Sequence, residues 1–150
     1  MEERFHTFTV LISNINRFIR KIKTEEMVEF NLKSPHVSCL YYLLKMGSLT
    51  AKELCDICQE DKASLSRSID YLETNGYLVC DSNLKKRYKS PLTLTTEGKK
   101  IAEIISQKID SILNLASNGL DDSDRNILYQ SLQLISNNLE KFCQKYEGED

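Results

Sequence analysis

Residues 61–98 read DKASLSRSIDYLETNGYLVCDSNLKKRYKSPLTLTTEG, and this stretch decides the predicted fold. It begins as a helix of small and polar residues, stops at Asn75 and Gly76, continues as a β-hairpin and enters a new helix at Thr95. Short side chains on a helix can approach base edges in the major groove of duplex DNA. A basic hairpin beside that helix offers cations to phosphates or to an adjacent minor groove.

The positive charge of the chain is concentrated at the tip of this hairpin. The whole chain has a formal net charge of −2, and residues 117–150 are rich in acids. Such asymmetry indicates a polyanionic partner at the tip and an acidic end that faces away from it. A solvated loop that happens to be basic is the alternative, because clustered cations alone are a weak signal. The cations between Ser82 and Ser90, where no acid occurs, are Lys85, Lys86, Arg87 and Lys89.

The bulk composition indicates one soluble, cytoplasmic domain. At 150 residues and 41% hydrophobic content the chain can bury a core, and no apolar run approaches the ~20 residues of a membrane span. Glu2 and Glu3 precede the first apolar residues, which is not typical of a secretory signal. Five scattered cysteines do not resemble a disulfide framework and are expected to be reduced: Cys39, Cys55, Cys58, Cys80 and Cys143.

Between residues 34 and 60 the sequence predicts two further helices. Ser34 and Pro35 favour a helix start, with Ser34 as the cap and Pro35 in the first turn. Thr50 and Glu53 form a capping-box pattern at the start of a short helix. Asp61 is the expected cap of the next helix, whose inward residues are Leu65, Ile69 and Leu72.

A short helix, a tight turn and a second amphipathic helix are typical of a helix-turn-helix. After it, Leu78 and Cys80 alternate with polar neighbours, as do Leu92 and Leu94, which predicts the two arms of a hairpin. The expected fold class is therefore mainly α with a small β-hairpin wing, a winged helix-turn-helix with helical extensions at both ends.

The two ends of the chain carry apolar stripes at heptad-like spacing. A first helix is expected over residues 4–29, and Asp121 is the expected cap of a last helix. These faces exceed what a module of residues 35–98 would cover, so we expect a homodimer, although a purely internal core remains the alternative. The expected dimerisation residues are Phe5, Phe8, Ile12, Ile15, Leu128, Leu132, Ile135 and Leu139.

The chain resembles the multiple-antibiotic-resistance regulator (MarR) family of winged-helix repressors. The matching segments are LTAKELCDIC (49–58), DKASLSRSIDYLETNGYL (61–78) and PLTLTTEGKK (91–100), and the helical extensions fit as well. The resemblance implies a dimer joined by its N- and C-terminal helices that binds a pseudopalindromic operator on double-stranded DNA. It also implies a transcriptional repressor that a small-molecule effector releases.

On this basis we expect a single domain over residues 1–150. Residues 1–33 and 117–150 would supply the dimerisation helices, 34–98 the DNA-binding lobe, and 95–117 a connecting long helix. The exposed face of the recognition helix is expected to contact DNA through Lys62, Ser64, Ser66, Arg67 and Tyr71.

The tip of the wing is expected to supply electrostatic affinity. Lys85, Lys86 and Lys89 are expected at phosphates, and Arg87 in a minor groove, where narrow grooves attract arginine. The resemblance implies an aspartate two residues before that arginine, but this chain has Lys85 there. A more basic tip would favour salt-sensitive backbone binding.

Other chemistry has weaker support in the sequence. Cys55-x-x-Cys58 lies near the end of a short helix rather than after a strand, and a zinc site would need two more ligands. His6 and His36 are isolated, and neither a phosphate loop nor a nucleophile elbow occurs. We therefore expect no enzyme, cofactor or metal. The remaining alternatives are a winged-helix module that binds only protein, and a regulator that senses oxidants or metal through cysteine.

Overall fold

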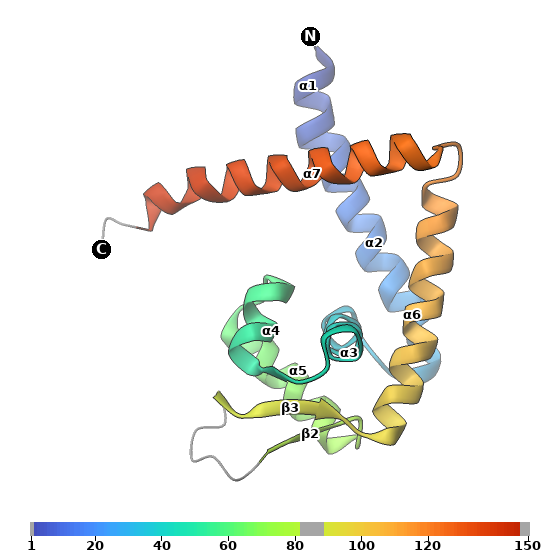
Figure 1. Ribbon diagram of the computed structural model, residues 1–150, viewed down its shortest axis with the longest axis vertical. Helices are drawn as coiled ribbons and strands as arrows, with labels where there is room; N and C mark the ends of the chain where they lie inside the picture. Colours follow the sequence, from blue (N-terminus) through green and yellow to red (C-terminus); the bar gives the residue numbers. More distant parts are fainter. Residues whose placement is uncertain (1, 82–88, 148–150) are drawn as a thin grey trace. The chain divides into compact units, whose positions relative to one another are not determined.

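The computed structural model describes residues 2–81 and 89–147, with the side chain of Glu2 excepted. The protein forms two compact units, residues 1–108 and 109–150, and the boundary falls inside helix α6 (Thr96–Ala116). The first unit holds a small three-stranded antiparallel sheet and most of the helices, and the second holds helix α7 (Asp122–Cys143) (Figure 1). This confirms the expected fold class, a mainly helical chain with a small β wing.

The N-terminal segment is helical over nearly the expected range. Helix α1 (Glu2–His6) and helix α2 (Ile12–Glu26) are joined by a π-helical turn, η1 (Thr7–Leu11), and the 3₁₀ turn η2 (Val28–Phe30) follows. The π turn was not expected. Because its hydrogen bonds span five residues rather than four, it rotates the apolar stripe that precedes it relative to the stripe that follows.

Helix α3 (Ser34–Met46) begins where the sequence predicted, but a different residue caps it. The N-cap is Lys33 rather than Ser34, while Pro35 lies in the first turn as expected. The backbone N–H of Lys33 donates to His36 Nδ1 at 3.0 Å, so an imidazole three residues on satisfies the backbone donor of the N-cap residue. His36 can do this because its ring is held in place by packing.

Strand β1 (Leu49–Thr50) leads directly into helix α4 (Ala51–Cys58). The expected capping box is confirmed: the Glu53 N–H donates to Thr50 Oγ1 at 3.2 Å, and the Thr50 N–H donates to Glu53 Oε2 at 2.7 Å. The Thr50 N–H, and the Thr50 hydroxyl that donates to Glu53 Oε2 at 2.9 Å, lower the pKa of the Glu53 carboxyl. Two otherwise unpaired backbone donors are thereby satisfied at the entry to the helix-turn-helix.

The core of the first unit is a set of leucines drawn from α3, α4, α5 (Lys62–Thr74) and the sheet. Helix α3 contacts α4, α5 and strand β3, and helix α5 contacts α4 and strand β2. Each fully buried leucine is expected to stabilise the fold by about 1.5–3 kcal/mol. The leucines with 2% exposure or less are Leu40, Leu43, Leu54, Leu65, Leu72, Leu78 and Leu92.

The hairpin arms are strands β2 (Leu78–Cys80) and β3 (Pro91–Leu94), as the alternating pattern predicted. Strand β3 lies in the middle of the sheet: it pairs antiparallel with β2, where Leu78 faces Leu94, and with β1, where Leu49 faces Leu92. Strand β1 therefore joins the base of the wing to the helix-turn-helix.

Helix α6 starts against the backbone of the wing, which explains a glycine in its first turn. Thr95 Oγ1 accepts the Gly98 N–H at 3.0 Å and donates to the Gly76 carbonyl at 2.6 Å. A Cβ added to Gly98 would lie 1.8 Å from the carbonyl oxygen of Tyr77. Only glycine fits this close approach of helix to backbone, so the Leu-Thr-x-x-Gly pattern of residues 94–98 has a steric cause.

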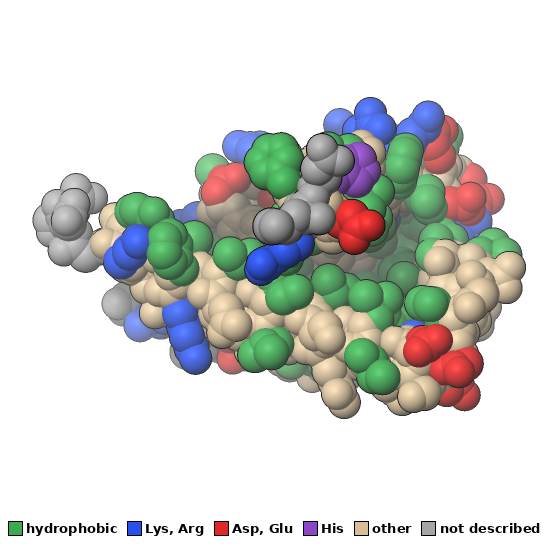
Figure 2. Space-filling model, turned by 90° about the horizontal axis from the view of Figure 1, so that it is seen from above, with side chains coloured by type: hydrophobic (Ala, Val, Ile, Leu, Met, Phe, Trp, Pro, Cys, Tyr) green, Lys and Arg blue, Asp and Glu red, His purple; other side chains and the backbone are tan. Residues whose placement is uncertain are grey.

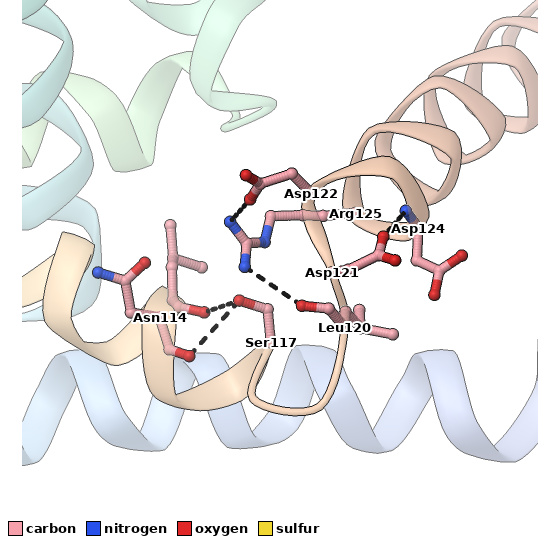
Figure 3. Close-up of polar contacts among 8 residues, drawn as sticks. Asn114, Ser117, Leu120, Asp121, Asp122, Asp124 and Arg125 are labelled. Atoms are coloured by element: carbon pink, nitrogen blue, oxygen red, sulfur yellow. Dashed lines mark hydrogen bonds and ion pairs between the residues drawn. The ribbon is translucent and has the colours of Figure 1, made fainter.

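A tight turn connects α6 to α7 in the second unit (Figure 3). Ser117 Oγ donates to the Leu113 carbonyl at 2.7 Å, and Asp121 caps α7 by accepting the Asp124 N–H at 2.8 Å, as expected. Arg125 bridges the turn: Nη1 pairs with Asp122 at 3.2 Å, and Nη2 donates to the Leu120 carbonyl at 3.5 Å. A short 3₁₀ turn, η4 (Gln144–Tyr146), follows α7. Over the described residues, no helix is both long and apolar enough to span a membrane.

Candidate nucleic-acid interface

Helix α5 is held at the surface of the first unit by a turn built from local hydrogen bonds. Gln59 adopts a left-handed conformation with φ 54°, and its side-chain amide donates to the Asp56 carbonyl at 2.9 Å. Asp61 then caps α5 by accepting the Ser64 N–H at 2.8 Å, which confirms the expected cap. The three residues between α4 and α5 therefore fix the direction of α5 relative to α4.

The two faces of α5 differ sharply in burial. Leu65, Ile69 and Leu72 are 1%, 4% and 0% exposed, which confirms the predicted inner face. On the outer face Lys62 and Arg67 are exposed, and Ser66 lies between them, also exposed. This face therefore combines two cations with a short hydroxyl side chain, the mixture that can reach phosphates and base edges.

Sequence reasoning missed two further residues on the outer face, Ala63 and Asp70, which are both exposed. Asp70 lies one helical turn after Ser66, so the 3.6-residue period alone would have placed it there. A carboxylate can accept a hydrogen bond from cytosine N4, and an alanine methyl can contact the thymine methyl.

Ser64 and Tyr71, both expected to contact DNA, take part in contacts within the protein. Ser64 is half-buried, and its carbonyl accepts the hydroxyl of buried Ser68 at 3.2 Å. The Tyr71 ring stacks on His36 with centroids 4.3 Å apart, and its hydroxyl donates to the Asn31 carbonyl at 2.6 Å. Tyr71 therefore ties α5 to the start of α3, and burial together with Lys33 lowers the pKa of His36.

The wing is described only at its base. Lys85, Lys86 and Arg87, the expected contacts of the tip, lie outside the described residues. Lys89 is described and exposed, whereas the next residue, Ser90, is fully buried. The Asp81 N–H donates to the Pro91 carbonyl at 3.0 Å and closes the two arms below the tip. Lys89 therefore places one exposed cation two residues before strand β3.

The terminal helices expose most of the stripe residues named from the sequence. In the first unit Phe5 is 75% exposed and Ile15 56%; in the second, Leu132 is 45% exposed and Leu139 55%. Phe8, Ile12 and Leu128 are also exposed, at 45%, 38% and 41%, and Ile135 is half-buried. Figure 2 shows many hydrophobic side chains at the surface of one face of the molecule.

A small cavity of about 360 Å³ lies between the end of α3, strand β3 and α6. Its apolar walls are Leu43, Leu44 and Leu94, and Lys99 supplies one cation. Among the described residues, no group of three or more His, Cys, Asp or Glu is arranged to hold a metal ion. The cavity wall therefore combines three leucines with one cation.

Comparisons with known proteins agree with this geometry. The MarR family model matches residues 30–87. The chain is 34% identical over 102 residues to YwoH, an uncharacterized HTH-type transcriptional regulator of Bacillus subtilis, a match that covers 66% of this chain and 74% of YwoH.

Solved structures with the same fold are more distant in sequence. A putative MarR family regulator of Listeria monocytogenes, complexed with a 26mer DNA, is 23% identical with a TM-score of 0.82, covering 93% of each chain. A MarR protein of Peptoclostridium difficile is 18% identical with a TM-score of 0.83, covering 93% of this chain and 92% of its own.

Proposed function

The chain belongs to the MarR family of winged helix-turn-helix transcriptional regulators, and on this premise we propose that it binds a pseudopalindromic DNA operator as a homodimer and represses transcription. The observation that carries the proposal is the outer face of α5, where Lys62, Ser66 and Arg67 are exposed over a fully packed inner face. The Listeria relative of the same fold was solved with DNA, which supports a DNA partner.

Within this proposal, the residues of α5 divide into two roles. Ser66, Arg67 and Asp70 read base edges in the major groove, and Lys62 contacts a phosphate. Tyr71 positions the helix through its hydroxyl, which bonds to the Asn31 carbonyl, and Ser64 does so through its backbone, which bonds to Asp61 and Ser68. Lys85, Lys86 and Lys89 contact phosphates, and Arg87 enters the minor groove, which would add affinity that falls with salt.

Dimerisation is proposed from the exposed stripes of the two ends. A monomer seldom exposes contiguous apolar patches larger than a few hundred Å², and twofold dimers are the commonest oligomers. Phe5, Phe8, Ile12 and Ile15 carry one stripe and residues 128–139 the other, and a second copy would bury both. A dimer also presents two copies of α5, which a pseudopalindromic site requires.

Release by an effector is proposed from the cavity beside strand β3. Its volume lies at the low end of ligand pockets, and its walls belong to α3 and β3, which both contribute to the lobe that holds α5. A ligand that binds one arrangement of α3 and β3 more tightly than the other shifts the protein toward that arrangement. The change in DNA affinity is then set by the difference between the ligand's affinities for the two arrangements.

Selection of genomic DNA fragments on the immobilised protein tests the proposed function. We expect recovery of a small set of sites that share an inverted repeat, bound far more tightly than random DNA of equal length. Elution from a heparin column at high salt alone would show only a basic surface. If the protein recovers no enriched fragments and binds all DNA equally at low salt, it does not recognise a specific operator, and the proposed function is wrong.

A further inference from the structure

Lys108 of helix α6 contacts two glutamates that belong to a distant part of the chain. Its Nζ donates to Glu26 Oε2 at 3.2 Å and lies 3.3 Å from Glu29 Oε1. Glu26 is the last residue of α2, and Glu29 is the middle residue of the 3₁₀ turn η2. One ammonium group therefore ties α6 to the end of α2 and to the turn that follows it. The boundary between the two units falls directly after Lys108, so this contact lies where α6 leaves the first unit.

The same turn supplies the acceptor for a side chain of α5. η2 ends at Asn31, which has a left-handed conformation with φ 55° and ψ 38°. The Asn31 carbonyl accepts the hydroxyl of Tyr71 at 2.6 Å. The position of this carbonyl depends on the turn, because the Asn31 N–H donates to the Val28 carbonyl at 3.0 Å. Only Phe30 separates Asn31 from Glu29, which carries the ion pair.

The ends of η2 and its middle are held in different ways. Met27 and Leu32, which flank the turn, are 2% and 3% exposed, so burial holds the two ends in the core. Val28 is 66% exposed and Glu29 is also exposed, so burial does not hold the middle. The ion pair with Lys108 restrains this exposed part of the turn.

We propose that Lys108 is a positioning residue for α5: by holding η2 it fixes the Asn31 carbonyl that binds the Tyr71 hydroxyl, and it thereby sets the orientation of the outer face of α5. The predicted effect on DNA affinity rests on the proposed function, whereas the effect on α5 itself needs no DNA. Because an exposed ion pair contributes little to folding and is screened by salt, the effect of Lys108 should be local and should shrink as the salt concentration rises.

Hydrogen exchange of the free chain, followed by mass spectrometry, tests the effect on α5 without DNA. In Lys108→Met, the amides of residues 28–31 and of the C-terminal half of α5 should exchange about two- to fivefold faster than in the wild type at low salt. Lys108→Arg, which keeps the charge, should restore most of the protection. Faster exchange confined to α6 would overturn the proposal.

Binding to a selected operator separates positioning from simple electrostatics. Glu26→Gln/Glu29→Gln makes the chain less negative, so the change in charge alone would strengthen binding to a polyanion. Loss of the ion pair should instead weaken binding about two- to fivefold. The matched control is Glu25→Gln/Glu103→Gln, which removes the same charge at two exposed positions and should not weaken binding. Stronger binding by both double variants would contradict the proposal.

A double-mutant cycle decides whether Lys108 acts through Tyr71. Tyr71→Phe removes the hydroxyl and keeps the ring that stacks on His36. Lys108→Met should weaken operator binding in the wild-type chain but not in Tyr71→Phe, where the bond to Asn31 is already absent. Equal losses in both chains would make Lys108 independent of Tyr71, and the assignment would be wrong. If the wild-type chain selects no operator, the proposed function fails, and the exchange measurement alone decides whether Lys108 positions α5.

Discussion

The helix-turn-helix lobe and the terminal helices use the same apolar spacing but differ in what covers it. In the lobe, Leu54, Leu72 and Leu92 are 0–1% exposed, because α3, α4, α5 and the sheet cover one another. On the terminal helices, Phe5 and Leu139 are more than half exposed. An apolar stripe in the sequence indicates that a helix has an apolar face. Whether the same chain covers that face is seen only in the packed structure.

The largest expected effect comes from placing a charge on the α7 stripe. If a second copy covers Leu132, then Leu132→Asp leaves an unpaired carboxylate in the interface at a cost of ~3–5 kcal/mol. Sedimentation equilibrium should show the variant as a monomer at concentrations where the wild-type chain is a dimer, and operator binding should be lost with it.

The matched control is Gln133→Asp, which adds the same charge about 100° around the same helix. Gln133 is exposed, and its side-chain amide donates to Asn137 Oδ1 one turn further along α7, at 2.8 Å. The control should sediment like the wild type. Equal dissociation by both variants would point to a general charge effect rather than to an interface at the stripe.

A core truncation in the lobe should lower stability without changing assembly. Leu72→Ala removes a side chain that is 0% exposed, and such truncations cost ~2–5 kcal/mol through lost burial and the cavity left behind. Urea unfolding followed by circular dichroism gives the free energy. A change below 1 kcal/mol, on the order of a surface substitution, would mean that α5 is not packed as described.

Truncating a side chain on the outer face of α5 should lower the affinity for DNA and leave the free energy of unfolding unchanged. Arg67→Ala should cost ~1–3 kcal/mol of operator affinity and relax the preference for one base if Arg67 reads a base edge. Titration of the variant on the operator and on single-base variants of it measures both effects. An equal loss on every sequence would make Arg67 a phosphate anchor, and no loss at all would remove α5 from the interface.

The smallest expected effect is a pH dependence at the join of α3 and α5. Burial and Lys33 lower the pKa of His36, so the unfolded chain takes up this proton at a higher pH than the folded chain. The contribution of neutral His36 is then present above the unfolded pKa of about 6.5, and it is lost as the pH falls from there through the lower folded pKa. His36→Gln should flatten this part of the stability profile, and His6→Gln, an exposed position, should not.

The sequence predicted the elements of the lobe because each has a local cause. The Thr50–Glu53 capping box, the Asp61 cap and the alternation in residues 78–94 act through neighbours in the chain, and all three appear in the structure. Contacts made between distant residues had no such signal. The His36–Tyr71 stack arises only when α3 packs against α5.

The candidate site was predicted in part for the same reason. Helical period and burial distinguished the inner face of α5 from the outer, so Lys62, Ser66 and Arg67 were placed outward correctly. The period could not show that the Tyr71 hydroxyl is bonded to the Asn31 carbonyl, since η2 and α3 come to α5 from a remote part of the chain. The partner of the terminal stripes follows from no pattern within one chain.

Hydroxyl-radical footprinting on a genomically selected operator tests the central claim most directly, because it reports the reading helix and the dimer together. Two copies of α5 presented by a twofold dimer should protect two inverted half-sites with centres about one helical turn, ~10 bp, apart. Leu132→Asp should abolish both protections at once. Protection of one unpaired half-site by the wild-type chain, at any concentration that saturates the DNA, would contradict the account.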